Sequence, residues 1–420
     1  MNNKCYTTTD ILLPDFSKVK GYQWAVIACD QFTSQPEYWE KVKKEVLSSP
    51  STLNITLPEV YLEDAEKLIP KINQTMKEYL KEVLVTIKDT AIYVERTQSD
   101  GTIRKGVVMA IDLESYDYHK GAKSLIRATE ATVEERIPPR VAIRRNAEIE
   151  LPHVMLLIDD PEKTAIEPLS KCCNGKVVYD TDLMLNGGHV KGTIMSKENV
   201  KNFSLALDNL ITSEKIESRY GDKNLTPLLF AVGDGNHSLA TAKASYEEIK
   251  SQIGIEKAST HPARYALVEI VNIHDVALKF EPIYRVMFNV NPQKVLKELK
   301  NYISNLNGNG SEQIVDCYYG KNKERIVIEK PTLQLTVATL QNFIDDYISK
   351  NKDAVVDYIH GENSVQELSS KENSIGFIFS GLEKSELFKT VMYDGALPRK
   401  TFSRGHAEDK RYYLECRKIK

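Results

Sequence analysis

Hydrophobic and polar positions repeat with both helical and strand spacing, which predicts a chain of mixed helices and strands. An apolar run from Leu228 to Val232 indicates a buried strand, and helix-forming residues continue from the glycine turn after it to about Lys250. Apolar residues at helical spacing in 200–211 predict an amphipathic helix before that strand. Apolar runs at 92–94 and 106–111 flank Ser99-Asp100-Gly101 and predict a hairpin.

The remaining elements are arranged without regular alternation of strand and helix, which favours the α+β class. Helices are expected at 36–47, 64–84 and 295–306, and strands at 25–28, 154–158, 176–179, 265–271, 286–290, 314–315, 325–328, 333–337 and 412–416. We therefore expect a main domain over residues 1–290, a smaller α+β domain over 291–390 and a C-terminal tail, 391–420, that returns to the core.

Composition narrows the class of protein. The 420 residues are 41% apolar and 27% charged with a net charge of −3, which is typical of a globular protein and gives no basic surface for nucleic acid or anionic membranes. The six cysteines are scattered, so neither a zinc site nor a disulfide framework is indicated. No run approaches the ~20 apolar residues of a membrane span, and no signal peptide is visible, so we expect a cytoplasmic protein of undetermined oligomeric state.

The turn after the strand at 228–232 carries the strongest chemical signal. Gly233-Asp234-Gly235-Asn236-His237 joins that strand to a helix, and the first amides of a helix attract anions. Glycines let the backbone approach a ligand, while Asp234 and His237 add acid–base capacity. The pattern predicts a phosphate or carboxylate site. A helix cap from Asp234 or Asn236 with a structural His237 accounts for it equally well.

A second cluster of charged residues lies at 127–145. It includes Arg127, Arg136 and Arg140, which are candidates to clamp a phosphate, and Glu130, a candidate base or magnesium ligand. Pro138-Pro139 predicts a rigid extended loop. Asp30, at the end of the strand expected at 25–28, is a further candidate base. The alternatives are a solvated, salt-bridged surface for the cluster and a capping role for Asp30.

These motifs, in this order, resemble a bacterial and archaeal family catalogued as domain of unknown function 1015. The family's strand-ending Asp-Gly-(His or Asn)-His box is matched by residues 234–237. The other matching segments are Arg127 to Thr132, Glu135 to Arg140, Glu281 to Arg285, Leu397 to Phe402 and Lys410 to Leu414. The resemblance spans about residues 8–418.

The resemblance implies a function, because the box is similar to the phosphate-binding box of ParB-like and sulfiredoxin-like domains, which include a free-serine kinase. It implies a ParB/sulfiredoxin-like core and phosphoryl transfer to a small hydroxyl metabolite, with serine or phosphoserine the most concrete case. ATP or ADP would be the co-substrate, and Glu130 and Asp234 would hold Mg²⁺. Further binding candidates are Ser238, Thr132, Arg285, Arg399 and His406.

The chain also departs from the family pattern. Asn236 stands where related boxes have histidine, and Ser238 where they have a phosphate-binding arginine. Tyr284 replaces a histidine, and Arg404 a smaller or apolar residue. The missing arginine keeps a non-catalytic sensor of nucleotides or phosphometabolites open beside a kinase or phosphatase. A metal-dependent phosphoesterase is a lesser alternative, because Gly235-Asn236-His237 lacks the Asp-x-His and Gly-Asp-x-x-Asp boxes upstream.

Overall fold

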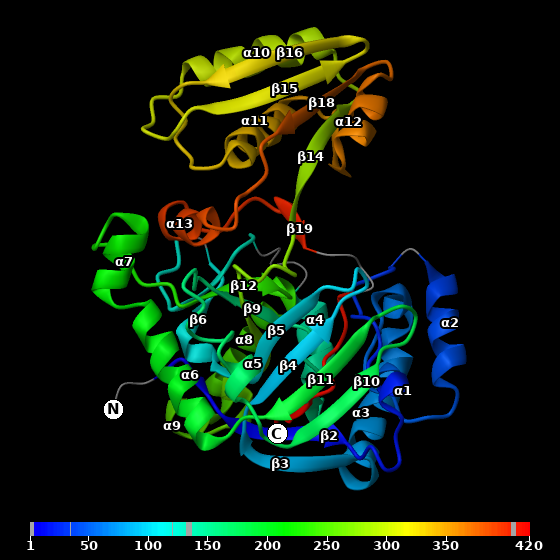
Figure 1. The fold of residues 1–420 in the computed structure, drawn as a ribbon. Coiled ribbons are helices and arrows are strands. Elements are labelled where there is room, and N and C mark those ends of the chain that lie inside the picture. The colour runs from blue at the N-terminus through cyan, green and yellow to red at the C-terminus, as the bar shows by residue number, and fades with distance from the viewer. Residues whose placement is uncertain (1–3, 34, 120, 132–136, 405–408) are drawn as a thin grey trace. The chain divides into compact units, whose positions relative to one another are not determined.

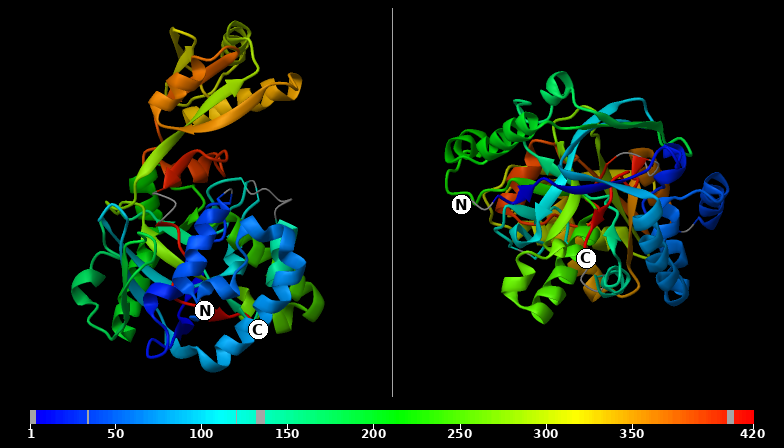
Figure 2. Two further views of the ribbon diagram at one scale, coloured as in Figure 1. Left: turned by 90° about the vertical axis from the view of Figure 1, so that its right-hand side faces the viewer. Right: turned by 90° about the horizontal axis from the view of Figure 1, so that it is seen from below.

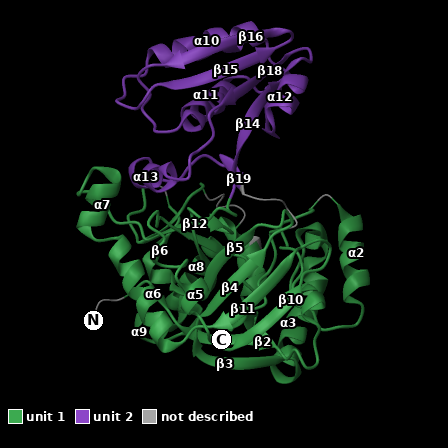
Figure 3. Ribbon diagram, in the orientation of Figure 1, with its two compact units in different colours: residues 1–278, 405–420 green, residues 279–404 purple. Residues whose placement is uncertain are grey.

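The computed structural model describes residues 4–33, 35–119, 121–131, 137–404 and 409–420, which form two compact units. Residues 1–278 and 405–420 make the first unit, and residues 279–404 make the second (Figure 3). The second unit thus begins before the expected boundary at 290, because β14 (Phe280–Phe288) pairs with β17 (Val355–His360) and β18 (Ser374–Phe379). Residues 391–404 of the expected tail also belong to it.

A mixed sheet organises the first unit, with strands in the order β10-β11-β4-β5-β13-β9-β12-β7-β6 and β1 paired to β5 (Figure 1). Its strands are β1 (Tyr6–Thr7), β4 (Ile92–Thr97), β5 (Ile103–Asp112), β6 (Tyr116–Asp117), β7 (Ile126–Ala128), β9 (Met155–Ile158), β10 (Val177–Asp182), β11 (His189–Ile194), β12 (Phe230–Asp234) and β13 (Tyr265–Asn272). Two small sheets pair β2 (Thr9–Pro14) with β3 (Leu84–Thr90) and β8 (Ile149–Glu150) with β20 (Arg417–Lys418).

Both faces of the large sheet are buried. Successive side chains of a strand point to opposite faces, and neighbouring residues of β5 enter two different cores. Val107 and Met109 of β5 pack in the core formed with α6 (Lys197–Leu210) and α8 (Asn236–Ile253), whereas Val108 packs in the core formed with α3 (Ala65–Glu82) and the C-terminal segment. That segment is red in Figure 2 and returns through the first unit to β20. The helices are α1 (Gly21–Trp24), α2 (Pro36–Val46), α3 (Ala65–Glu82), α4 (Ile137–Arg144), α5 (Leu169–Cys172), α6 (Lys197–Leu210), α7 (Ser213–Tyr220), α8 (Asn236–Ile253) and α9 (Ile255–Ala258).

The second unit is an antiparallel sheet with helices. Its strand order is β16-β15-β18-β14-β17, and β19 (Phe402–Arg404) pairs antiparallel with the first residues of β14. The other elements are β15 (Gln313–Tyr319), β16 (Asn322–Ile328), α10 (Pro292–Ser304), α11 (Thr336–Lys350), α12 (Glu362–Ser369) and α13 (Glu386–Tyr393). The core gathers apolar side chains such as Val295 and Leu299 of α10 and Phe343 of α11.

The α+β class predicted from the sequence is confirmed. Several local predictions are wrong. Residues 25–28 and 412–416 form isolated bridges, Ile27 with Arg411 and Leu12 with Cys416, in place of named strands. The expected strand at 333–337 overlaps the start of α11. Pro138-Pro139 belongs to α4 and not to an extended loop, because prolines fit a first helical turn, whose amides have no intrahelical partner.

Candidate functional site

The turn between β12 and α8 has the geometry of a close-approach site. Gly235 has φ +80°, a left-handed conformation that L side chains rarely adopt. A Cβ on Gly235 would also lie 3.1 Å from the Cα and 3.0 Å from the Cγ2 of Val154. Glycine is therefore needed here for both backbone conformation and space.

This glycine also shapes the start of α8. Ser196 and Thr212 use their side chains to cap α6 and α7, but the N-cap residue of α8 is Gly235, which has none. The Oδ1 of Asn236 is buried and has no hydrogen-bond partner among the residues that the structure describes. Within the described residues, the Asn236 amide thus leaves an unsatisfied acceptor at the start of α8, where buried polar groups are normally hydrogen-bonded.

Two strand ends bring carboxylates to the edge where the turn lies. β7 and β12 are parallel neighbours, with Ala128 opposite Val232. Glu130 follows Ala128 by two residues, as Asp234 follows Val232, and the Thr129 hydroxyl donates to the Val232 carbonyl at 2.6 Å. Glu130 and Asp234 therefore lie at the same edge of the sheet.

Lys410 brings a cation from the C-terminal segment to this edge. Its Nζ lies 3.8 Å from Oδ2 of Asp234, and both side chains are about a quarter exposed, 28% and 27%. The Lys410 carbonyl accepts from the Ala28 amide at 2.8 Å, so the segment leading to Asp30 lies beside the same lysine. Asp30 itself is exposed and accepts from the Gln31 side chain at 3.0 Å.

Arg127 is not brought to the turn. Its guanidinium donates to the carbonyls of Ser124, Thr226 and Pro227, at 2.8, 3.1 and 2.9 Å. These residues precede β7 and β12, so they lie at the opposite edge of the sheet from Asp234. Burial lowers the pKa of Arg127, and its carbonyl partners give it a structural role.

The other predicted arginines are also held by partners. Arg140 of α4 forms an ion pair with Glu59, so its charge is largely neutralised. Arg285, fully buried in the second unit, donates to Gln341 and to the carbonyls of Ile283, Lys400 and Arg399. Arg399, in the same unit, donates to the Tyr358 hydroxyl at 3.1 Å. The predicted site residues Thr132, Arg136 and His406 lie outside the described residues.

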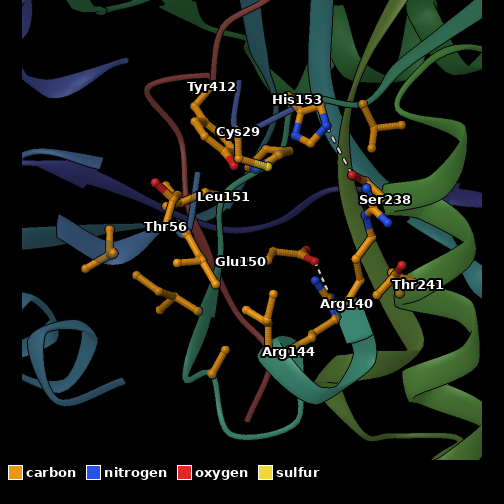
Figure 4. A pocket seen from close by; sticks show the side chains of 18 of the residues that line it. Cys29, Thr56, Arg140, Arg144, Glu150, Leu151, His153, Ser238, Thr241 and Tyr412 are labelled. Carbon is orange, nitrogen blue, oxygen red and sulfur yellow. Dashed lines mark hydrogen bonds and ion pairs between the residues drawn. The ribbon is translucent and has the colours of Figure 1, made fainter. Parts of the chain in front are cut away.

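A cavity of about 200 Å³ lies under the first turns of α8. Figure 4 shows His153 facing Ser238, with Tyr412 and Cys29 next to His153. The Nε2 of His153 is hydrogen-bonded to the Ser238 hydroxyl at 3.1 Å, and the His153 and Tyr412 rings meet edge to face at 5.3 Å. Burial raises the pKa of Cys29 to about 12, so its thiol stays protonated and is no nucleophile at neutral pH.

Sequence reasoning missed His153, Tyr412, Glu59 and the charge of Lys410 as parts of this site. His153 follows Pro152 in a short connection and belongs to no motif. Lys410 stands in the Lys410-to-Leu414 motif, and the expected return of the tail to the core was the available signal for it. The contact with Asp234 depends on a chain path that local patterns do not encode.

The donor set at the strand ends is compatible with Mg²⁺ only together with a ligand. Glu130 and Asp234 supply two carboxylates, and Mg²⁺ in phosphoryl-transfer sites is commonly held by one or two carboxylates plus phosphate oxygens. Among the described residues, no group of three or more His, Cys, Asp or Glu side chains is arranged to hold a metal ion.

No helix in the described ranges has the length and apolarity needed to cross a membrane.

The comparisons with known proteins give the family. The model of the family described as "Protein of unknown function (DUF1015)" matches residues 15–383, and the chain belongs to this family. No curated protein matches the chain.

Three solved structures resemble parts of the fold. A free serine kinase variant in complex with ADP has a TM-score of 0.36 and 11% identity, over 71% of this chain and 88% of the other. A conserved hypothetical protein from Pyrococcus furiosus has a TM-score of 0.33 and 11% identity, over 71% and 90%. SbnI from Staphylococcus aureus has a TM-score of 0.34 and 9% identity, over 71% and 82%. No activity is carried over from them.

Proposed function

We propose that the protein transfers a phosphoryl group between a nucleotide, ATP or ADP, and a small hydroxyl metabolite. The observation that carries the proposal is the turn at Gly235, where a helix without an N-cap side chain starts beside a lysine and two strand-end carboxylates. Helix amides and Lys410 are suited to phosphate oxygens. Family resemblance makes serine, or phosphoserine in the reverse direction, the first substrate to test.

The described residues would have distinct roles in the reaction. The amides at the start of α8, Asn236 and Lys410 would hold the terminal phosphate, and His237 would donate a hydrogen bond to it. Glu130 and Asp234 would hold Mg²⁺, which would neutralise phosphate charge when bound. Glu130 or Asp30 would take the acceptor's proton as the acceptor oxygen bonds to phosphorus and the bond to the bridging oxygen breaks.

A sensor of nucleotides or phosphometabolites is the second candidate. Arg127 donates to carbonyls at the far edge of the sheet, and Arg140 is paired with Glu59. Phosphoryl transfer normally uses several cations to stabilise the transferring group, whereas binding needs fewer. The partners of these two arginines favour this candidate.

Phosphorus NMR tests both candidates. The protein with Mg²⁺ is incubated with ATP or ADP plus L-serine, and separately with O-phosphoserine. A new phosphoserine signal supports transfer, and both Glu130→Gln and His237→Ala should then lower the rate. Phosphate released from phosphoserine alone would show hydrolysis, with water as the acceptor. Glu82→Gln, at the end of α3, is the control for a lost carboxylate. Broadened nucleotide signals without turnover of serine or of any other alcohol offered as acceptor favour the sensor, and unchanged spectra without binding contradict both.

A further inference from the structure

The cavity beside the turn differs in chemistry from the turn itself. Most of its wall is aliphatic, including Ile55, Leu57, Ile72, Met76, Leu239 and Leu267. All six side chains belong to the buried cores of the first unit and are at most 8% exposed. Such a surface favours an apolar occupant and disfavours a polar one without hydrogen-bond partners.

The charged residues of the wall are already paired with one another. Arg140 pairs with Glu59, and Arg144 pairs with Glu150. Glu150 also accepts from Nε of Arg417 at 2.8 Å and from the Leu267 amide at 2.9 Å. A charged ligand group in this cavity would have to break one of these pairs, so the part of a ligand that enters is uncharged.

The polar part of the cavity wall adjoins the turn. Ser238 lies in the first turn of α8, two residues after Asn236, and is hydrogen-bonded to His153. A hydroxyl placed between these two side chains can replace their mutual hydrogen bond while it stays within one helical turn of the Asn236 amide. One molecule can therefore present a hydroxyl to a phosphate at the turn and its carbon chain to the cavity.

We propose that this cavity binds the hydroxyl acceptor, which is an alcohol with a compact aliphatic body and not an acceptor as polar as serine. The inference rests on the proposed function and specifies its substrate class. The cavity has a volume of about 200 Å³, which exceeds the ~150 Å³ of an apolar cavity known to bind benzene, so an aliphatic body of about six carbons fits. A nucleobase fits less well, because its ring nitrogens and amino groups need partners that aliphatic walls do not provide.

The first test uses straight-chain primary alcohols, from ethanol to octanol, with the wild-type protein. Affinity measured by titration calorimetry should rise about fourfold per methylene up to about hexanol and then stop rising, because each buried methylene adds a similar increment. With ATP and Mg²⁺, the acceptor-dependent kcat/KM should follow the same order and exceed that for serine. Affinity independent of chain length would overturn the inference.

Variants assign the effect to the cavity. Ala242→Leu places three carbons in the cavity from α8 and should abolish the dependence on chain length, whereas Ala244→Leu, on the same helix but not in the cavity wall, should leave it unchanged. Met76→Ala enlarges the cavity from α3 and should shift the optimum to longer alcohols, which keeps the inference testable if Ala242→Leu does not fold.

The outcomes separate the two proposals. If the protein binds nucleotide but its affinity for alcohols does not depend on their chain length, the acceptor site is contradicted and phosphoryl transfer still stands. If Ala242→Leu loses alcohol binding and the wild-type protein binds no nucleotide, phosphoryl transfer is contradicted and the cavity remains an apolar binding site. If Ala242→Leu weakens ATP binding and leaves alcohol binding unchanged, the cavity holds the nucleobase and the inference is wrong.

Discussion

Lys410 Nζ lies 3.8 Å from Oδ2 of Asp234, so the C-terminal segment supplies a cation to the turn that starts α8. The same residue is fixed by its backbone, because its carbonyl accepts from the Ala28 amide. In the proposed function, a lysine held in this way would supply part of the positive charge of the arginine that related boxes carry at the position of Ser238. The C-terminal segment is thus part of the proposed phosphate site and not only of the core.

Replacing Lys410 should weaken phosphate binding more than it weakens the fold. Lys410→Met keeps the length of the side chain and removes its charge, so the affinity for ADP should fall about tenfold, the value of one charge-assisted hydrogen bond. The unfolding free energy should change little, since the ion pair is partly exposed. Titration calorimetry checks the affinity, and Lys257→Met on α9 is the control. Equal affinities of wild type and Lys410→Met would contradict the phosphate site.

Gly235→Ala should destabilise the first unit more than a matched glycine substitution does. Gly221, after α7, has φ +78° with open space around it, so Gly221→Ala should cost only the strain of a left-handed residue, about 1 kcal/mol. Gly235→Ala adds the overlap with Val154 and should cost about 2–3 kcal/mol.

Tryptophan fluorescence during urea unfolding measures this difference for the relevant unit. The two tryptophans of the chain, Trp24 and Trp39, are both buried in the first unit. If the two glycine variants lose the same unfolding free energy, the close approach of Val154 has no energetic role. A larger loss for Gly221→Ala would contradict the prediction outright.

A buried ion pair between two neighbouring strands of the large sheet, β5 and β13, gives another stability prediction. NH2 of Arg104 lies 2.7 Å from Oε2 of Glu269, with side-chain exposures of 5% and 0%. Arg104→Met leaves the Glu269 carboxylate buried without this partner and should cost about 3–5 kcal/mol. The double variant Arg104→Met, Glu269→Gln should regain part of that loss. Urea unfolding followed by tryptophan fluorescence checks both, and a double variant less stable than the single one would contradict the ion-pair explanation.

Local sequence patterns predicted the turn, but they did not predict which of the nearby charged side chains lie at it. The apolar run before Asp234, the glycines and the helix after them are encoded within some twenty residues, so β12, the turn and α8 follow from the sequence. The sequence placed Glu130 only within the charged cluster at 127–145, whereas in the structure it follows β7 and lies at the same edge of the sheet as Asp234. Arg127 faces the other edge, since the fold determines which carbonyls it meets.

The cavity depended on long-range packing and was not predicted. Its wall combines segments near residues 29, 56, 140, 153, 238, 266 and 412, which no periodicity connects. The same limit explains why the pairing of Arg140 with Glu59 was not foreseen. The sequence shows how many arginines a segment carries, but it does not show which carboxylates from distant segments the fold places beside them.

Glu415 should make the first unit less stable as pH rises. Burial raises the pKa of Glu415 to about 7, although the Tyr179 hydroxyl, which donates to its carboxylate at 2.5 Å, acts in the opposite direction. In the unfolded chain a glutamate has a pKa near 4.3. Between these values the folded state holds more protons, so the unfolding free energy falls as pH rises and the loss is complete above the folded pKa.

The variant Glu415→Gln cannot ionise and should escape this loss. From pH 5 to pH 8 its unfolding free energy relative to wild type should increase by about 2.5 kcal/mol, while Glu82→Gln, an exposed carboxylate on α3, should show no such trend. Urea unfolding followed by tryptophan fluorescence at the two pH values measures it. A constant difference between Glu415→Gln and wild type would mean that Glu415 is already ionised at pH 5, which contradicts the prediction.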